Sequence, residues 1–352
     1  MKKLMLTTAI AGLALTASAI AQTSITGEMR VTHKAIGSEV STGSTTTSGR
    51  GFGTEQQINF ANKGKLNVGG LDYAAGFSLE NDGSQSTSLF NENAYIDITN
   101  ASSGTTLSFS IDHIQRNDSD RSAANIFGFA PSEFSSSGHA SLMSATPGPG
   151  VGQSQSIAVI QDIGKFGKLA YNYAPTATDK AATTATGAGS SEAFTETNEK
   201  SAYEISFVGN LGVQGLTVDY FTSKQNSMVG QAVKAEGQNI GVRYNTGALT
   251  LGVARKIWND DATTTKVETT EKNYGIAYAV NNNVTLGLLH ATAENNVASS
   301  PAGTVTQKLT AVQLGYNLGP VALTVGVARN TDLNGVAGQD SDMIMTRLVG
   351  AF

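Results

Sequence analysis

Groups that could perform catalysis or bind a metal are few in this chain. There is no Cys, and the four His are His33, His113, His139 and His290. No His lies in a motif such as G-x-S-x-G or H-E-x-x-H, where a nucleophile would have its base or a metal its ligands. The stretch DSDRS (118–122) begins like a calcium loop, but Ala123 and Phe129 occupy the positions where an EF-hand needs Gly and Glu. We therefore expect no enzyme, no cofactor and no metal site, with a looser calcium site in this stretch left open.

Charged side chains in one long segment are the other candidates for chemistry. The segment 114–154 is far longer than the roughly 12–15 residues beyond which structureless loops are usually functional or disordered. Its acidic candidates are Asp118, Asp120 and Glu133. Its stretch ANIFGFAPSEF also holds Phe127, Phe129 and Phe134, which favour a loop packed against a wall over a loop in solvent.

The elements that flank this segment have the two-residue period of β-strands. In TLSFSID (106–112), Leu107, Phe109 and Ile111 alternate with polar residues, which predicts a strand with two different faces. Sixteen segments alternate in this way, and most have the roughly 9–11 residues that a tilted strand needs to cross a bilayer. They are 24–34, 55–65, 71–80, 91–99, 105–113, 155–163, 168–175, 200–210, 216–225, 237–246, 248–257, 272–280, 284–293, 307–317, 321–330 and 341–352.

The connections between these segments alternate between long and short. Counted along the chain, the even-numbered segments are followed by short turns such as NVGG, GKFG and LGP. The odd-numbered segments are followed by longer polar loops. Transmembrane barrels have this asymmetry, with short periplasmic turns and longer extracellular loops. The sequence therefore predicts an all-β fold, a 16-stranded antiparallel transmembrane β-barrel over residues 22–352 with both ends on the periplasmic side.

Charge parity along the predicted strands supports the barrel. Most charged residues share the face of the small polar side chains, which lines the lumen of such a barrel. Three basic residues instead fall on the lipid-facing parity, at the loop ends of their strands: Arg255, Lys308 and Arg329. Either the strands have left the membrane there, or these groups face the phosphates of lipopolysaccharide at the outer interface.

The first 21 residues resemble a secretory signal peptide. Lys2 and Lys3 precede an apolar run, and Ala19 and Ala21 form a small-x-small cleavage site. We expect export through the periplasm to the Gram-negative outer membrane. The net charge of −5 does not favour nucleic-acid binding, which needs clustered Lys and Arg.

The whole mature chain resembles the general trimeric porins of Gram-negative outer membranes, most closely the Rhodobacter-type porins of α-proteobacteria. The stretch INFANKGKLNVGGLDYAAGFSLEND (58–82) is similar to the hairpin of the second and third strands in that family. The resemblance implies a homotrimer whose water-filled channels pass ions and small hydrophilic solutes by passive diffusion. It also implies that the long third loop (114–154) folds inward and narrows the pore. A substrate-selective channel of the same architecture and an outer-membrane barrel enzyme are the less favoured alternatives.

In this family the acidic residues of the third loop face a basic cluster across the pore. The resemblance therefore places the acidic candidates of the loop opposite basic residues on the lumen parity. These basic candidates are Arg30, Lys34, Lys63 and Arg347. Phe127, Phe129 and Phe134 are the expected loop anchors, and APSEF is similar to the Pro-Glu-Phe element of enteric porins. Charged rings set the ion preference of a channel, and the acidic excess favours mild cation selectivity.

The stretch MTRLVGAF (345–352) is expected to close the barrel. Phe352 has the parity of Ile344 and Leu348, so its ring should face lipid, while Arg347 faces the lumen. This strand should pair with the first strand near Gln22, because an open sheet edge is not viable in lipid. The resemblance further implies that Phe352 is an assembly signal for the barrel-insertion machinery.

Overall fold

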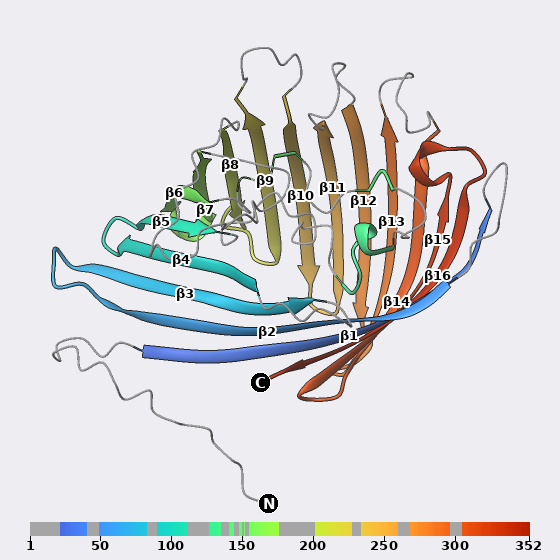
Figure 1. Cartoon of the computed structure of the whole chain (residues 1–352), viewed down its shortest axis with the longest axis horizontal. Helices are drawn as coiled ribbons and strands as arrows, with labels where there is room; N and C mark the ends of the chain where they lie inside the picture. The colour runs from blue at the N-terminus through green and yellow to red at the C-terminus, as the bar shows by residue number, and fades with distance from the viewer. Residues whose placement is uncertain are drawn as a thin grey trace, which may run out of the picture.

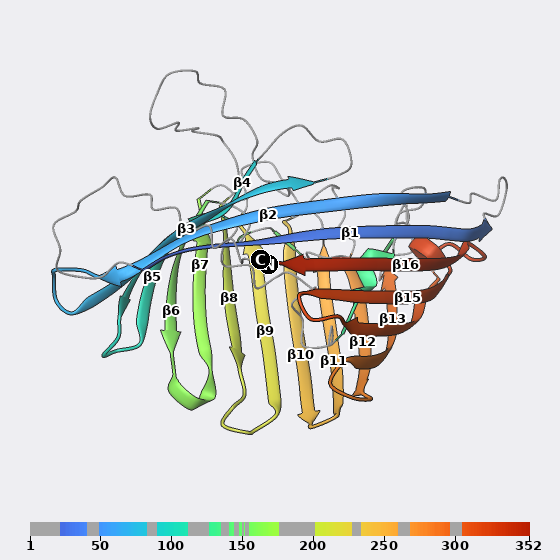
Figure 2. The same ribbon diagram turned by 90° about the horizontal axis from the view of Figure 1, so that it is seen from below.

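The strands of the chain form a closed ring in the computed structural model (Figures 1 and 2). The structure describes residues 22–40, 49–82, 90–111, 127–134, 141–143, 148–149, 151, 155–175, 201–226, 234–259, 268–295 and 305–352. Each strand is antiparallel to the next along the chain, and the last pairs with the first. The predicted 16-stranded antiparallel barrel is confirmed. The expected signal peptide lies outside the described residues.

The strands are similar in order to those predicted but differ in length. They are β1 (Gln22–Val40), β2 (Gly49–Lys65), β3 (Leu71–Asp82), β4 (Phe90–Asn100), β5 (Thr105–Ile111), β6 (Ser156–Asp162), β7 (Lys168–Ala174), β8 (Ala202–Gly209), β9 (Leu216–Gln225), β10 (Glu236–Thr246), β11 (Leu249–Asn259), β12 (Glu268–Ala279), β13 (Val284–Asn295), β14 (Gln307–Asn317), β15 (Val321–Thr331) and β16 (Asp340–Ala351). Three short 3-10 turns are also described: η2 (Pro131–Phe134), η3 (Gly164–Phe166) and η4 (Leu333–Gly335). No helix among the described residues is long and apolar enough to cross a membrane.

The first hairpin is longer than the sequence predicts. β1 has 19 residues and β2 has 17, and they remain paired as far as Ile36 and Gly49. The sequence analysis placed a loop at 35–54. The stretch GRGFGT at the start of β2 lacks the apolar alternation that marks a strand, although its backbone pairs in register with β1. Pairing with a neighbour therefore extends this strand where the side-chain pattern ends.

The two faces of the sheet differ as the period-two pattern predicts. On β14, Leu309, Ala311 and Gln313 are buried inside the ring, whereas Val312 and Tyr316 are exposed outside it. Outward tyrosines recur on other strands: Tyr171, Tyr173, Tyr244, Tyr274 and Tyr278. The barrel thus has an apolar and aromatic outer surface and an inner surface of small and polar side chains.

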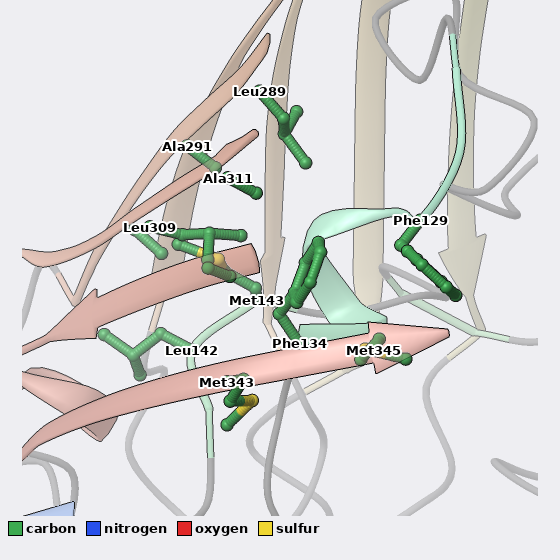
Figure 3. Close-up of a cluster of buried hydrophobic side chains, with 12 residues drawn as sticks. Phe129, Phe134, Leu142, Met143, Leu289, Ala291, Leu309, Ala311, Met343 and Met345 are labelled. Carbon is green, nitrogen blue, oxygen red and sulfur yellow. The ribbon is translucent and has the colours of Figure 1, made fainter. Parts of the chain in front are cut away.

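The main buried cluster lies inside the ring rather than between layers (Figure 3). Phe129, Phe134, Leu142 and Met143 come from the connection between β5 and β6, which is the third loop. They pack against inward side chains of the last strands: Leu289, Ala291, Ala293, Leu309, Ala311, Ala328, Met343 and Met345. The described parts of the third loop therefore fold into the barrel, as expected.

The seam of the barrel differs from the expected pairing by several residues. The backbone groups of Phe352 bond to Gly27 and not near Gln22, with N–O distances of 2.8 and 2.9 Å. The first residues of β1, up to Thr26, continue past this point and pair with β2. Closing a sheet of tilted strands into a barrel staggers the pairing, so the ends of the first and last strands need not coincide. The ring of Phe352 is exposed on the outside beside Gly27, which agrees with its predicted parity.

Candidate functional site

The described parts of the third loop contact the inner wall of the barrel at several separate strands. Its first described part contacts β14 and β15, where Phe129 and Phe134 are held. Farther along, the backbone N–H of Leu142 donates to Gln307 of β14 at 2.8 Å. Gly148 lies directly against Gly237 of β10. Val151 then packs with Ala174 of β7 and Ala202 of β8. These described parts of the loop thus contact the wall at β14 and β15, at β10, and at β7 and β8.

Glu133 is the acidic residue at which the loop meets the basic wall. Its carboxylate accepts a hydrogen bond from the guanidinium of Arg347 on β16. The Nζ of Lys34 on β1 donates to the backbone oxygen of Glu133 at 2.9 Å. Arg347 is fixed from its other side because its Nε donates to Thr32 Oγ1 at 3.1 Å. The side chains of Arg347 and Glu133 are 21% and 22% exposed, so this ion pair borders the lumen instead of being sealed from it.

The turn that presents Glu133 is stabilised from within the loop. The residues Pro131–Phe134 form the 3-10 turn η2, and Pro131 favours such a turn because its φ is fixed. The second carboxylate oxygen of Glu133 accepts a hydrogen bond from the N–H of Ala130 at 2.8 Å. The guanidinium of Arg347 lies 4.7 Å from the ring centre of Phe129, where a cation–π contact adds to the ion pair.

The aromatic anchors rest on glycines of the wall. The ring of Phe127 lies over Gly287 and Gly315, and the rings of Phe129 and Phe134 lie over Gly326. Phe129 and Phe134 contact each other edge to face, with ring centres 5.7 Å apart. Figure 3 shows both rings beside Met345 of β16.

Amide side chains of the wall hold the loop backbone between these rings. Gln313 of β14 accepts from the N–H of Phe129 at 2.6 Å and donates to its carbonyl oxygen at 3.1 Å. Asn330 of β15 donates to the carbonyl oxygen of Phe134 at 2.9 Å. All these contacts are buried, so each satisfies backbone groups that would otherwise be costly inside the barrel.

A second group of charged side chains, on β1 and β2, lies next to the ion pair of Glu133 and Arg347. Arg30 occupies the next inward position of β1 after Thr32 and pairs with Glu28 and Glu55, the latter at 2.9 Å. Arg30 is therefore a lumen residue, as expected, but its partners are wall carboxylates. Sequence reasoning did not include Glu55 in the site, although it lies on the lumen parity of β2 directly opposite Arg30.

The remaining predicted site residues lie elsewhere. Thr32, which bonds Arg347, pairs in register with Gly53 of β2. Lys63 lies ten residues farther along β2, a separation of about 33 Å at the usual rise of a strand, and pairs with Gln22 at the other end of the barrel. Lys63 has the lumen parity of Glu55, but parity does not show how far along the barrel axis a residue lies. Lys63 is therefore not near Arg347 and Lys34. Asp118 and Asp120 lie outside the described residues.

The wall beside Lys34 and Thr32 is open. Their register partners on β2 are Gly51 and Gly53. A Cβ on either glycine would have no neighbour within 4 Å among the described residues. Among the residues that the structure describes, the lumen at this point is thus bounded by charged side chains on β1 and β16 and by the glycine backbone of β2.

Comparison with known proteins identifies this architecture. A sequence model described as Gram-negative porin matches residues 7–330. The chain belongs to the Gram-negative porin family. It is an outer-membrane channel for the passive diffusion of solutes, as the resemblance in its sequence implied. A comparison with curated proteins found no match.

Solved structures show the same fold at low sequence identity. OmpF of Salmonella typhi in complex with daunomycin has a TM-score of 0.64 and 12% identity, covering 94% of this chain and 97% of that one. The anion-selective porin of Comamonas acidovorans has a TM-score of 0.64 and 13% identity, covering 94% and 100%. A mutant porin of Rh. blastica has a TM-score of 0.56 and 12% identity, with the same coverage as the Comamonas protein.

The porin also has a row of basic side chains on its outer face. The register aligns Arg255 of β11 with Lys272 of β12, then Thr292 of β13 and Lys308 of β14. Lys272 was missed in the sequence analysis, although it shares the lipid-facing parity of Tyr274. Arg329, in contrast, is paired with Asp340 and Asp342, both at 3.2 Å.

One buried ion pair lies on the inner wall. Lys256 of β11 and Glu271 of β12 are register partners, with Nζ and Oε1 2.8 Å apart and exposures of 1% and 0%. Asn273 donates a second hydrogen bond to the same carboxylate oxygen at 2.7 Å. Both charges are buried, so loss of one partner is expected to destabilise the barrel more than loss of both.

Proposed function

We propose that the constriction of this porin lies where the third loop meets β1 and β16, with Glu133 on the loop side and Lys34 and Arg347 on the wall side. The observation that carries this proposal is the contact of Glu133 with both basic residues, next to the open wall at Gly51 and Gly53. Solutes would pass between the loop and the first strands. Asp118 and Asp120 are proposed as further acidic groups of the same loop.

We propose that the channel as a whole has a mild preference for cations. Around Glu133 the two bases leave a local excess of positive charge, but Arg30 beside it is outnumbered by Glu28 and Glu55. Farther along the inner face, β3 and β4 contribute Glu80 and Asp97. Acidic side chains thus outnumber basic ones along the first four strands and the loop contact, which favours cations in a charged channel.

The test is the reversal potential of single channels in a planar bilayer under a potassium chloride gradient. Glu133→Gln removes one negative charge and should move the reversal potential toward anion preference. A unit charge acting over 4–8 Å in water is worth about 0.5–1 kcal/mol, so the cation-to-anion ratio should fall about two- to fivefold. Asp72→Asn, near a periplasmic turn, is the matched control and should have a smaller effect. Equal reversal potentials for Glu133→Gln and the unsubstituted porin would contradict the proposal.

We further propose that the porin is a homotrimer and that residues 1–21 are removed during export. Membership of the porin family supports both. The mass of the purified outer-membrane protein would test the cleavage, and its size in detergent before and after heating would test the trimer. A mature mass that includes residues 1–21, or a monomer in mild detergent, would contradict the respective part.

We also propose that the basic row of Arg255, Lys272 and Lys308 binds the phosphates of lipopolysaccharide. Its support is the alignment of three outward cations at the loop ends of β11, β12 and β14, where anionic headgroups attract Lys and Arg. Arg329 contributes less, because Asp340 and Asp342 already neutralise it.

A further inference from the structure

Three inward glycines of neighbouring strands form a hollow that the third loop fills. They are Gly287 of β13, Gly315 of β14 and Gly326 of β15, and we call them the glycine trough. A Cβ on Gly287 or on Gly315 would lie 2.5 Å from the ring of Phe127. A Cβ on Gly326 would lie 2.9 Å from the ring of Phe129 and 3.1 Å from that of Phe134. Any side chain at these positions would therefore occupy the place of a loop ring.

The backbone does not require glycine at these positions. None of the three has the left-handed φ that favours glycine. Glycine in a strand interior weakens the strand, and it often marks a site where another group approaches closely. The close approach here is made by three aromatic rings from one loop, so the trough has a positioning role and no conformational one.

Gln313 lies in the middle of the trough. The register places it directly between Gly287 and Gly326, and Gly315 is the next inward residue of its own strand. Gln313 bonds both backbone groups of Phe129. The aromatic rings on either side of Gln313 therefore fix the position of the loop along the wall. The amide of Gln313 fixes the distance between the loop backbone and the wall.

Two rows of register partners, each running across neighbouring strands, connect the glycine trough to the contact of Glu133 with Arg347 and Lys34. One row runs from Gly326 through Met345 and Lys34 to Gly51. The other runs from Gly315 through Thr324, Arg347 and Thr32 to Gly53. Along each row, a ring of the loop fills the space over the glycine at one end, whereas a Cβ on the glycine at the other end would meet none of the described residues.

We propose that the glycine trough is a specificity-determining positioning element of this porin. It seats the aromatic side of the third loop so deeply that Glu133 reaches Arg347 and Lys34 and the space before Gly51 and Gly53 stays open. A side chain in the trough pushes the loop toward that space and separates Glu133 from its partners. This inference rests on the constriction proposed above, and its test separates the two.

The experiment compares four variants as single channels in planar bilayers: Gly315→Ala, Phe127→Ala, the double variant, and Gly350→Ala. Folding is checked first by heat-modifiable migration. In Gly315→Ala the ring of Phe127 must move by about 1 Å to regain an ordinary contact distance. Both conductance and reversal potential should change, because the loop and its charge move together. Gly350→Ala adds the same methyl group on the outer face, 3.9 Å from Val321, and should leave the reversal potential unchanged.

The double variant tests whether the effect passes through the ring. Phe127→Ala removes the ring and makes room for the methyl group. Gly315→Ala should therefore have little further effect when Phe127 is already Ala. Additive effects of the two substitutions would overturn the proposal, as would a folded Gly315→Ala channel that matches Gly350→Ala. If Gly315→Ala does not fold, Gly287→Ala takes its place in the same comparison with the same expected result.

Glu133→Gln separates the inference from the constriction on which it rests. If Glu133→Gln shifts the reversal potential and Gly315→Ala does not, the trough fails and the constriction stands. If neither shifts it, the constriction itself is wrong. A shift in both, with the double variant resembling Phe127→Ala, supports the trough.

Discussion

Arg347 of β16 joins Glu133 of the third loop to the barrel wall, and its guanidinium also covers the ring of Phe129 at 4.7 Å. The two residues are 214 positions apart in sequence. Their contact connects the charge of the constriction with the aromatic side of the loop. Arg347 contacts both the carboxylate of Glu133 and the ring of Phe129. Substitutions of the charged residues and of the aromatic residues should therefore both change the conductance or the reversal potential of the channel.

Lys34 should affect ion preference in the direction opposite to Glu133. Lys34→Met removes a positive charge whose Nζ bonds the loop backbone at 2.9 Å. The cation-to-anion ratio should rise about two- to fivefold by the same Coulomb argument. The reversal potential under a salt gradient measures this ratio. Lys65→Met, an exposed residue paired with Asp72, is the control, and an equal rise in both variants would contradict a special role for Lys34.

The buried pair of Lys256 and Glu271 should respond strongly when one partner is lost. Glu271→Gln leaves Lys256 charged and buried, which should cost about 3–5 kcal/mol in the free energy of unfolding. Lys256→Met together with Glu271→Gln removes both charges and should recover much of that loss. Thermal or urea unfolding of the barrel in detergent measures both. A double variant less stable than Glu271→Gln alone would show that the pair does not act as a unit.

The seam of the barrel should be sensitive to Gly27. In Gly27→Val the new side chain would occupy the place of the Phe352 ring, and overpacking of this kind costs about 1–3 kcal/mol. We expect a lower yield of folded, heat-modifiable barrel, and we propose that recognition of Phe352 by the insertion machinery suffers as well. Gly350→Ala is the matched control at the same seam, because its Cβ would lie 3.9 Å from Val321, an ordinary contact. Equal yields of the two variants would contradict the expected effect.

The outer basic row should stabilise the barrel in a lipid-dependent manner. Replacing Arg255, Lys272 and Lys308 by Gln should lower the unfolding temperature more in lipopolysaccharide than in phosphatidylcholine. Each basic residue near an anionic surface contributes about 1 kcal/mol. The loss in the free energy of unfolding should therefore be about 3 kcal/mol larger in lipopolysaccharide than in phosphatidylcholine at low salt. Arg329→Gln should show a smaller difference. An equal loss of stability in both lipids would mean that the row binds no lipid phosphate.

The barrel was predictable from the sequence because each strand has two chemically distinct faces. A period of two shows which residues share a face, so the inward position of Arg347 and the outward position of Phe352 could both be predicted. Parity does not show how far along the barrel a residue lies. Lys63 and Arg30 share a face, but about eight residues of β2 separate Lys63 from the partner of Arg30.

The fit of the loop to the wall could not be predicted in the same way. The third loop has no period, and its path depends on which inward positions leave room for its rings. Gly287, Gly315 and Gly326 share the inward parity of their strands, but the sequence does not show that register brings them together beneath Phe127 and Phe129. Likewise, GRGFGT forms a strand because β1 offers it a partner, and its side chains gave no signal of that.

The most direct test of the constriction is the reversal potential of Arg347→Gln beside that of Glu133→Gln, measured in the same salt gradient. If their ion pair borders the narrowest part of the pore, Arg347→Gln should shift the potential toward cation preference and Glu133→Gln toward anion preference. Reversal potentials that stay at the unsubstituted value in both variants would contradict the account.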